Sequence, residues 1–575
     1  MPIHNSDIAD SLSKVADLLD IKGANPFRVR AYRQASATIS GLSQNITDML
    51  DQGKNLSDLS GIGQDLAGKI QEIAETGRLK QLKELEAELP EALPRMMQME
   101  SLGPKRVKTL YDKLNIKSLS DLESAAKSDK IKALKGFGQK TQDKILDELE
   151  RLQQSGEKQR FRWAIAEDYI KPLQDYLQGI DGVKQLDIAG SYRRRKETVG
   201  DVDILVSWKQ DADVMDPFVR YEDVERILAH GDTKSSVVLR NGLQVDLRVV
   251  PQAGYGAALH YFTGSKAHNI AVRKMGVDRG FKINEYGVYK GGKRIAGKTE
   301  TEVYEQVGLP FIPPELRENN GEFKAAESND LPELIDLSDI KGDLQSHTTA
   351  SDGKFSLKDM AEAARKKGYE YLAVTDHSKR VSVAGGLDDK KLEQQLQRIE
   401  KLNPSFEDFR ILKSIEVDIL EDGSLDLSND ILKELDIVIC SIHYNTQLTE
   451  KQQTKRVIKA MQNPHFHIFA HPTGRLIGER EPYKLDMDAV MDAAKDNNCF
   501  LELNAQPVRL DLSDTHCRMA KEKGIKLAIS TDAHTTDDLD HMRFGIGQAR
   551  RGWLEADDVL NTHSWNELKT LLKKS

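Results

Sequence analysis

The chain has 575 residues, of which 39% are hydrophobic and 30% charged, and this predicts a globular protein of about three to five domains because single cores rarely grow beyond about 250–300 residues. No apolar run approaches the ~18 residues of a membrane span, and the N-terminal MPIHNSDIADSLSK has no signal-peptide core, so we expect a cytoplasmic protein. Three cysteines without a metal-type spacing fit a reducing compartment, and a net charge of −9 restricts any nucleic-acid surface to a local basic patch.

Residues 1–150 are predicted to be helical and contain three related stretches in which a glycine turn precedes a helix. They are LSGIGQDLAGKI, ESLGPKRVKTLY and LKGFGQKTQDKI. Such a turn exposes backbone N–H groups at a helix N-terminus, where a phosphate can bind; for a single copy, an ordinary glycine-capped helix hairpin is the alternative. The three copies resemble the helix-hairpin-helix motifs of DNA repair proteins. That resemblance implies DNA-backbone contacts at Gly61, Gly63, Gly103, Lys105, Gly136 and Gly138.

Two prolines in ELPEALPRMM, residues 88–97, predict a hinge within this region. We therefore expect an N-terminal DNA-binding domain over 1–88 and a fingers-like helical domain with two further hairpin motifs over 89–154.

Helix and strand patterns alternate from residue 155, with strands predicted at 183–188, 202–206, 236–239 and 243–250. Asp201 and Asp203 open one apolar strand and point to the same face, because residues two apart on a strand do so. Two carboxylates near an apolar core repel each other, and Mg²⁺ would relieve this repulsion. Asp246 on another apolar strand would complete a two-metal site for an in-line displacement. A solvated strand end is the alternative.

Upstream of these aspartates, a tight turn, a hydroxyl and a guanidinium suit a triphosphate. They come from Gly190, Ser191 and Arg194, and Gly200 leads into the aspartate pair. Gly-Ser followed by Asp-x-Asp resembles the nucleotidyltransferase superfamily.

The stretch YFTGSKAHNIAVRKMGVDRGFKINEYGVY, residues 261–289, resembles the thumb of the family X DNA polymerases, the DNA polymerase beta group. The resemblance implies that Tyr261, Phe262 and the Gly264–Ser265 turn contact the sugar and exclude a ribose. It also implies that Asn269 meets the incoming base and that Arg273 contacts the template strand. Independently, residues 266–298 hold nine Lys/Arg against two Asp/Glu, a local basic patch suited to a phosphate backbone.

One departure from the beta-type pattern is Gln244, which stands where that enzyme has an arginine two residues before the third aspartate. We expect the palm over 155–250 and the thumb over 251–316. The polar, aperiodic residues 317–335 are interpreted as an interdomain linker.

A lyase site is a further feature of the beta-type N-terminal domain, which NPFRVRAYRQAS and Lys69 resemble. Lys69 lies at the position of the Schiff-base lysine, but Asp65 replaces a neighbouring lysine and would stabilise the protonated amine. Since a Schiff base needs the neutral amine, we favour contact between Lys69 and a 5′-phosphate over lyase activity.

Residues 336–575 repeat a strand-then-helix pattern that predicts an α/β barrel. Apolar runs such as YLAVTDHS, HIFAHPTG, CFLELNAQ and LAISTDAH end in polar residues, and the carboxyl ends of barrel strands line active sites. Imidazoles and carboxylates together suit Zn²⁺ or Mn²⁺. The candidate ligands are His347, Asp352, His377, Glu416, His443, His471, Asp532 and His534.

The stretches DLQSHTTASDG, SIEVDI, SIHYN and FAHPTGR resemble the polymerase and histidinol phosphatase (PHP) domain. The resemblance implies a metal-dependent phosphoesterase acting as a 3′–5′ exonuclease, with abasic-site or 3′-end processing as related activities. Gln345 replaces the first histidine of the usual His-x-His, and its carbonyl is a weaker ligand than imidazole. An active nuclease and a vestigial, structural barrel are therefore both open.

Together these features predict a multidomain α and α/β fold with a helix-hairpin-helix region, a nucleotidyltransferase palm plus thumb, and a C-terminal, distorted TIM-like PHP barrel. We interpret the chain as a bacterial-type family X DNA polymerase that fills short gaps in base excision repair and trims 3′ ends. The expected partners are gapped or nicked DNA and dNTPs, no membrane is expected, and the chain is expected to be a monomer. The expected cofactors are Mg²⁺ or Mn²⁺ in the palm and Mn²⁺ or Zn²⁺ in the barrel.

Two rival functions are a nucleotidyltransferase acting on RNA or a small molecule, and a DNA-end scaffold with inactive sites. The hairpin motifs and YFTGS argue against the first. The intact trio Asp201, Asp203 and Asp246 argues against the second.

Overall fold

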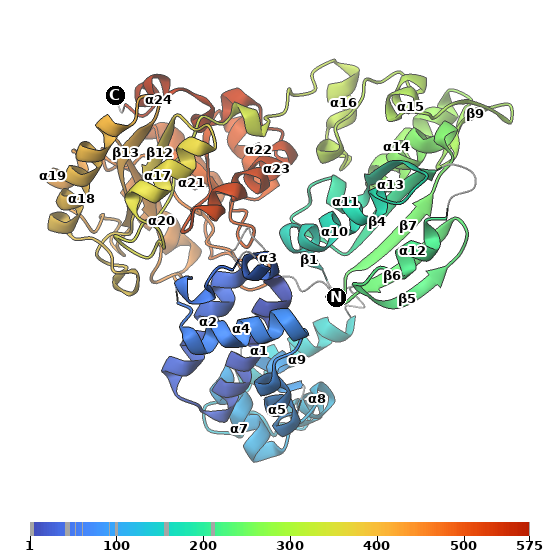
Figure 1. Cartoon of the computed structure of the whole chain (residues 1–575). Coiled ribbons are helices and arrows are strands. Elements are labelled where there is room, and N and C mark those ends of the chain that lie inside the picture. Colours follow the sequence, from blue (N-terminus) through green and yellow to red (C-terminus); the bar gives the residue numbers. More distant parts are fainter. Residues whose placement is uncertain are drawn as a thin grey trace. The chain divides into compact units, whose positions relative to one another are not determined.

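The computed structural model of the chain (Figure 1) describes residues 5–40, 46–51, 53–59, 61–90, 92–97, 102–154, 160–208 and 213–573. The chain forms two compact units. One comprises Met1–Arg160 with Arg220–Arg226 and Val238–Leu243, and the other comprises the remaining residues.

The N-terminal region is helical, as predicted. Its helices are α1 (Asn5–Lys22), α2 (Pro26–Ser40), α3 (Ile46–Asp51), α4 (Gln64–Thr76), α5 (Lys80–Glu88), α6 (Ala92–Met97), α7 (Pro104–Leu114), α8 (Leu119–Lys127) and α9 (Gln139–Gln154). In α1, Ile8, Leu12, Val15 and Leu19 are buried at helical spacing, which gives the helix one apolar face. The region holds two hydrophobic cores, one beneath α1–α5 and one beneath α6–α9.

The stretch predicted as a hinge, 88–97, contains the short helix α6. Leu93 and Met96 of this helix are fully buried in the second core. Residues 92–97 are therefore helical and packed, because Leu93 and Met96 lie three apart and reach one face of a helix turn.

The palm is a five-stranded sheet in the order β2-β4-β7-β6-β5. Its strands are β2 (Val183–Ile188), β4 (Asp201–Trp208), β5 (Val224–His230), β6 (Lys234–Leu239) and β7 (Gln244–Val249). The four predicted strands are confirmed within two residues at each end. Strand β5 was not predicted because it is a largely exposed edge strand whose sequence does not alternate between apolar and polar residues.

Helices and short strands surround the palm and form the thumb (Figure 1). They are β1 (Phe161–Arg162), α10 (Trp163–Gln178), α11 (Gly190–Arg193), β3 (Thr198–Val199), α12 (Met215–Val219), α13 (Tyr255–Thr263), α14 (Lys266–Asp278), β8 (Lys282–Asn284), β9 (Gly287–Lys290), β10 (Lys293–Ala296) and α15 (Glu300–Gln306).

The segment interpreted as a linker, 317–335, contains α16 (Glu322–Glu327). Arg317 and Glu322 in this segment are fully buried. Arg317 pairs with Glu300 at 2.6 Å, and Glu322 pairs with His268 at 2.8 Å. The sequence of this segment has the composition of a polar linker because the side chains that form its buried ion pairs are charged.

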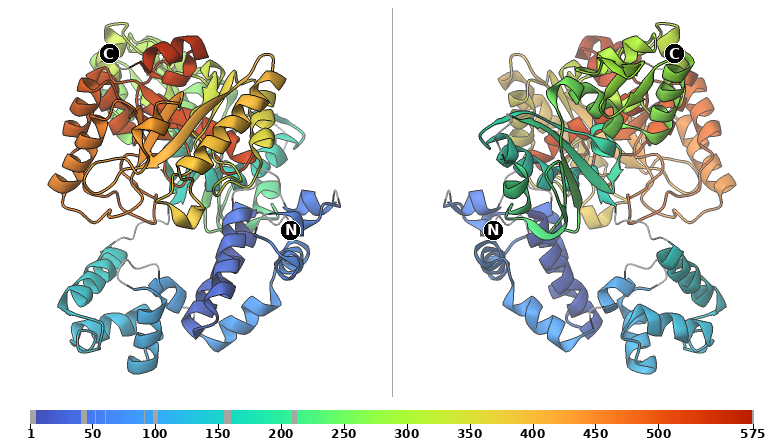
Figure 2. Two further views of the ribbon diagram at one scale, coloured as in Figure 1. Left: turned by 90° about the vertical axis from the view of Figure 1, so that its left-hand side faces the viewer. Right: turned by 90° about the vertical axis from the view of Figure 1, so that its right-hand side faces the viewer.

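The C-terminal region is a nearly closed barrel of seven parallel strands in chain order (Figure 2). They are β11 (Gly342–Asp343), β12 (Tyr371–Val374), β13 (Arg410–Asp418), β14 (Ile437–Ser441), β15 (Ile468–Phe469), β16 (Phe500–Asn504) and β17 (Leu527–Ser530). The predicted α/β barrel is confirmed. A bridge between Ser346 and Ala533, just beyond β11 and β17, links the first strand to the last.

Helices α17–α22 lie between successive strands along the chain, and α23 follows the last strand. Helix α24 packs against the side chains inside the barrel. Their bounds are α17 (Leu357–Lys366), α18 (Asp389–Leu402), α19 (Asn429–Leu432), α20 (Glu450–Met461), α21 (Met487–Asp496), α22 (Asp514–Lys523), α23 (Met542–Arg551) and α24 (Trp565–Leu571). One buried cluster contains Leu568 of α24 and the first residues of three strands, Tyr371, Ile437 and Phe500. This cluster fills the amino-terminal end of the barrel and leaves the carboxyl ends for polar side chains.

Within the described ranges, every helix is too short or too polar to cross a membrane.

Asn561, which is fully buried, also connects the first strand of the barrel to the last. Its Nδ2 donates to the carbonyls of Gly342 in β11 and Ile529 in β17, both at 2.8 Å, and its Oδ1 accepts from the Ile529 N–H at 3.0 Å. One side chain thus joins the two edges of the sheet.

We expect Asn561→Ala to lower the free energy of unfolding of the barrel by about 3 kcal/mol, because buried backbone groups lose their partners. Calorimetric unfolding of the full chain measures this loss. Asn566→Ala, at an exposed position of α24, is the control and should stay within about 0.5 kcal/mol of the parent. Equal stability of the two variants would contradict the role of Asn561.

Candidate functional site

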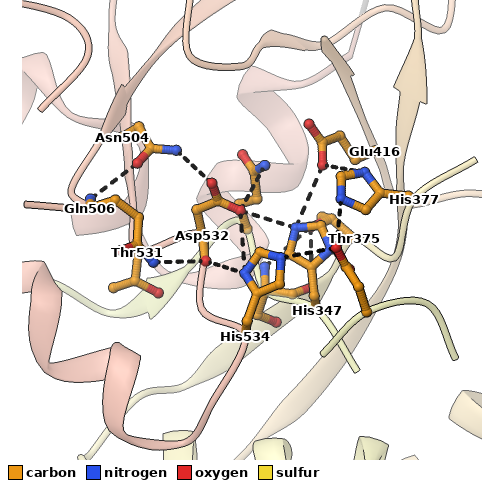
Figure 3. Close-up of polar contacts among 12 residues, drawn as sticks. His347, Thr375, His377, Glu416, Asn504, Gln506, Thr531, Asp532 and His534 are labelled. Carbon is orange, nitrogen blue, oxygen red and sulfur yellow. Dashed lines mark hydrogen bonds and ion pairs between the residues drawn. The ribbon is translucent and has the colours of Figure 1, made fainter. Parts of the chain in front are cut away.

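Polar side chains gather at the carboxyl ends of the barrel strands (Figure 3). Figure 3 shows His347 lying between His377 and Glu416 on one side and Asp532 and His534 on the other. The eight predicted ligands come from β13 and from the loops after β11, β12, β14, β15 and β17, and parallel strands bring these ends to one edge.

Glu416 is the centre of this cluster and is 1% exposed. Its carboxylate oxygens lie 3.0 Å from Nδ1 of His377, 3.1 Å from Nε2 of His471, 3.4 Å from Nε2 of His443 and 3.5 Å from Nε2 of His347. Four imidazoles therefore surround one buried carboxylate.

Asp352, Asp532 and His534 complete the cluster. Asp532 Oδ1 lies 3.1 Å from His347 Nε2, and Asp352 Oδ2 lies 3.4 Å from His377 Nε2 and 3.5 Å from His534 Nε2. Among the residues that the structure describes, two sets have ligand atoms close enough to share one metal ion each: His347, Asp352, His377 and His534, and His377, Glu416 and His443. The structure thus brings all eight predicted residues together.

Charges within the cluster shift one another's pKa values. Burial acts to lower the pKa of His377, but Glu416 and Asp352 outweigh it and raise the value to about 11. Burial acts to raise the pKa of Glu416, but the facing imidazoles hold it well below its ordinary value. The carboxylates thus require positive charge beside them.

The donor set fits a divalent metal. Among the described residues, both ring nitrogens of His347, Nδ1 of His377 and Oε2 of Glu416 are buried and make no hydrogen bond of acceptable geometry. Buried polar atoms rarely lack a partner, and imidazole with carboxylate is the ligand set of Zn²⁺ and Mn²⁺ sites.

Gln345 lies in the same cluster and is fully buried. Its Nε2 is 3.5 Å from Oδ1 of Asp532, and its Oε1 makes no hydrogen bond to any residue that the structure describes. The side chain therefore stands beside the ligands, where the missing histidine was expected.

Three further residues support the ligands and were not predicted. Glu502 accepts the His471 N–H at 2.6 Å, and Asn504 donates to Asp532 at 3.1 Å. Arg509 lies 3.9 Å from Asp532 and is partly exposed. Glu502 and Asn504 could have been found from the sequence, because their strand, CFLELNAQ, ends in polar residues as the ligand-bearing strands do.

In the palm, strand register brings Asp203 beside Asp246, and Asp201, two residues before Asp203 on β4, is near enough to raise the pKa of Asp203. Strands β4 and β7 are parallel neighbours in which Asp203 lies opposite Asp246 and Asp201 opposite Gln244. Arg248 lies 3.7 Å from Asp203 and 3.6 Å from Asp246. The two carboxylates thus share the guanidinium of Arg248.

The surroundings shift the pKa values of Asp203 and Asp246 in opposite directions. Burial raises the pKa of Asp203 to about 6; Arg248 opposes this, and Asp246 adds to it. Burial also acts to raise the pKa of Asp246, but hydrogen bonds from Lys234 at 2.9 Å and Gln244 at 2.9 Å lower it. Gln244, the departure from the beta-type pattern, thus orients the third aspartate.

The turn predicted to bind a triphosphate lies beside Asp203. Gly190 has φ +68°, and a Cβ there would lie 3.3 Å from Asp203 Oδ2, so the close approach favours glycine. Ser191 lies in α11, and Gly200 directly precedes β4. Arg194 donates from Nε to Glu318 at 3.1 Å and from a terminal nitrogen to the Thr263 carbonyl.

The predicted sugar- and base-contacting residues lie at the junction of α13 and α14. Tyr261 and Phe262 form an edge-to-face pair with ring centroids 5.1 Å apart. Asn269 donates to the Tyr261 carbonyl at 2.7 Å, and Ser265 caps α14 by accepting the His268 N–H. Arg273 is exposed on α14, where a DNA strand can reach it.

The glycine turns of the N-terminal unit have a common geometry. Gly63 and Gly103 cap α4 and α7 with φ/ψ of −81°/171° and −79°/170°. A Cβ at Gly63, Gly103 or Gly138 would meet no atom within 4 Å. Gly61 and Gly136 have φ of +76° and +90°, which glycine adopts readily. Lys105 is exposed in the first turn of α7.

Lys69 in α4 pairs with Asp65 at 2.5 Å. Burial acts to lower the pKa of Lys69, but hydrogen bonds to Asp65 and Tyr32 outweigh it and raise the pKa. The amine is therefore held in its charged form, as the sequence interpretation required.

Five family models match the chain. They describe a "Helix-hairpin-helix domain" over residues 3–79, a "SAM-like Helix-hairpin-helix tandem" over 94–151, a "DNA polymerase beta palm" over 166–248, a "DNA polymerase beta thumb" over 258–318 and a "PHP domain" over 343–506. They match the regions where each fold was expected.

Curated relatives include one that matches the chain over its whole length. The "DNA polymerase/3'-5' exonuclease PolX" of Bacillus subtilis (strain 168) is 40% identical over 577 residues, which covers 100% of both chains. A "Probable phosphatase" of Thermoanaerobacter sp. (strain X514) is 31% identical over 243 residues, 40% of this chain and 94% of the relative. A "Probable phosphatase" of Caldanaerobacter subterraneus subsp. tengcongensis is 30% identical over 243 residues, 40% and 91% respectively.

We expect Asp65→Asn to lower the pKa of Lys69, because the substitution removes the negative charge that stabilises the ammonium. The amine should then lose its proton at a lower pH than in the parent. An NMR titration of ¹³C-methylated lysines measures the shift. The control is Glu123→Gln, which removes the partner of the exposed Lys127 and should leave the Lys69 titration unchanged. An identical titration of Lys69 in the parent and Asp65→Asn would refute the assignment.

Proposed function

The chain belongs to the bacterial family X DNA polymerases that carry a C-terminal PHP domain, and from this we propose that it fills short gaps in DNA during base excision repair and trims 3′ ends. It is a DNA polymerase with a 3′–5′ exonuclease. The observation that carries the proposal is the full-length relationship to a polymerase/exonuclease, combined with the register that pairs Asp203 with Asp246.

In the palm, Asp201, Asp203 and Asp246 would hold Mg²⁺ or Mn²⁺. Divalent ions at such a site stabilise the attacking and leaving oxygens of a phosphoryl transfer. Gly190, Ser191, Arg194 and Gly200 would bind the triphosphate of a dNTP, because a tight turn beside the aspartates offers N–H, hydroxyl and guanidinium donors.

The remaining palm and thumb residues would orient the nucleotide and the template. Tyr261, Phe262, Gly264 and Ser265 would contact the sugar, and Asn269 the base. The exposed Arg273 would bind the template backbone.

DNA would be held by its backbone on both sides of the gap. The glycine turns at Gly61–Gly63, Gly103 and Gly136–Gly138 offer N–H groups to phosphates, Lys105 adds charge, and the protonated Lys69 suits a 5′-phosphate. We propose a monomer that acts in the cytoplasm on gapped or nicked DNA. The division into domains 1–88, 89–154, 155–250, 251–316 and 336–575, connected by the ordered segment 317–335, is part of this proposal.

In the barrel, the eight clustered ligands would hold Mn²⁺ or Zn²⁺, which would polarise a phosphodiester and activate water. Arg509 would contact the phosphate, because its partly exposed guanidinium lies beside Asp532. Gln345 supports a second candidate, a vestigial structural barrel, since it replaces one imidazole. The convergence of the other eight ligands favours an active exonuclease.

We expect Asp203→Ala to reduce primer extension on a gapped duplex by about 10³-fold or more, because metal stabilisation of the transition state amounts to several kcal/mol. Extension of a 5′-labelled primer in a gapped duplex with Mg²⁺ and dNTPs measures the loss. Shortening of the same primer without dNTPs is the control and should persist. Near-normal extension by the variant would mean that the palm assignment is wrong.

Shortening is expected to depend on the barrel alone. His377→Ala should abolish it and leave extension intact, because His377 belongs to both metal-type groups. Gln345→His should lower the Mn²⁺ concentration needed for shortening, because imidazole is the stronger ligand.

Primer shortening across a Mn²⁺ titration measures both effects. Shortening by Gln345→His but not by the parent would identify a vestigial barrel. If neither protein shortens the primer or binds Mn²⁺, the metal-site assignment is wrong.

A further inference from the structure

Glu318 lies between the nucleotide-binding turn and the barrel. One of its oxygens, Oε1, accepts a hydrogen bond from Nε of Arg194 at 3.1 Å and another from a terminal nitrogen of Arg551 at 3.0 Å. Lys196 approaches the same oxygen at 3.8 Å. A single carboxylate therefore connects the palm turn to helix α23 of the barrel.

Arg551 is held firmly in this position. Its side chain is only 4% exposed, and its second terminal nitrogen donates to Asp514 at 2.6 Å. The nitrogen that bonds Glu318 also donates to the main-chain carbonyl of Arg194 at 2.9 Å. The barrel thus touches both the partner of Arg194 and the backbone of Arg194 itself.

These contacts fix the direction of the Arg194 guanidinium. Nε is bound by Glu318, and one terminal nitrogen is bound by the Thr263 carbonyl, next to the Gly264–Ser265 turn. An arginine side chain has large rotamer freedom, and a ligand that must first immobilise it binds more weakly. A guanidinium oriented in advance avoids this loss.

We propose that Glu318 and Arg551 are positioning residues for nucleotide binding, through which the barrel holds Arg194 ready for the triphosphate. This inference rests on the proposed function, in which Arg194 binds the triphosphate. The barrel then contributes to polymerisation as well as to 3′-end trimming, with no residue of the barrel touching the nucleotide.

A second ion pair between the same parts of the unit provides a matched control. Arg543, also on α23, pairs with Glu167 of α10 at 2.5 Å. Neither residue has a described contact with Arg194 or with Glu318. Loss of this pair should weaken the attachment of the barrel without altering the contacts of Arg194.

The test is steady-state extension of a gapped primer by the full-length protein at varied dNTP concentration, for Glu318→Gln, Arg551→Met, Arg551→Lys, Arg194→Ala and Arg543→Met. We expect Glu318→Gln and Arg551→Met to raise KM for dNTP roughly 2- to 10-fold, the range for immobilising one long side chain. The kcat should change little, and Arg551→Lys should recover part of the KM. Primer shortening without dNTPs should match the parent.

Two further readouts separate positioning from general loss of structure. The double variant Glu318→Gln/Arg551→Met should raise KM no more than the larger single change, because the two residues act in one chain of contacts. Arg543→Met should leave KM for dNTP at the parent value.

Each result decides between distinct possibilities. If Arg194→Ala leaves KM unchanged, the proposed role of Arg194 fails and the inference fails with it. If Arg194→Ala raises KM but Glu318→Gln and Arg551→Met do not, the inference alone is overturned. An equal rise in Arg543→Met would also overturn it, since barrel attachment by itself would then explain the effect.

Discussion

Carboxylates buried at the ends of strands need positive charge beside them, and both sites of this protein are built around that constraint. A buried anion without a partner is costly. In the barrel, four imidazoles surround Glu416; in the palm, Arg248 lies between Asp203 and Asp246. The same clustering that makes the carboxylates costly to bury makes them effective ligands for divalent cations.

The two sites meet this constraint with different chemistry. The palm offers carboxylate oxygens, which suit a hard cation that keeps contacts with substrate phosphates. The barrel mixes imidazole with carboxylate, which suits borderline metals such as Zn²⁺ and Mn²⁺. The candidate ligands for synthesis and for trimming therefore form two separate sets, and each set comes from its own sheet.

Buried charge pairs also hold the thumb and the segment after it in place. Glu300 accepts from Arg193 of the palm turn and from Arg317, and both Glu300 and Arg317 are buried. Burial acts to raise the pKa of Glu300, but the two guanidinium groups hold it at about 2. A segment rich in charged residues is thus an ordered part of the structure.

The sequence by itself determined the fold class and most of the ligand set, because these follow from local patterns. Apolar runs that end in polar residues predicted the barrel and its eight ligands, and Asp-x-Asp on a strand predicted the palm. The sequence could not show that Gln244 orients Asp246 or that Asn561 joins β11 to β17, since register and closure depend on strands far apart in the chain. It also presented residues 317–335 as a linker, because a charged residue that is buried in a pair has the same local signature as one exposed to water. Only the tertiary structure decided which charges are paired, and so which residues, Glu318 among them, connect the palm turn to helix α23 of the barrel.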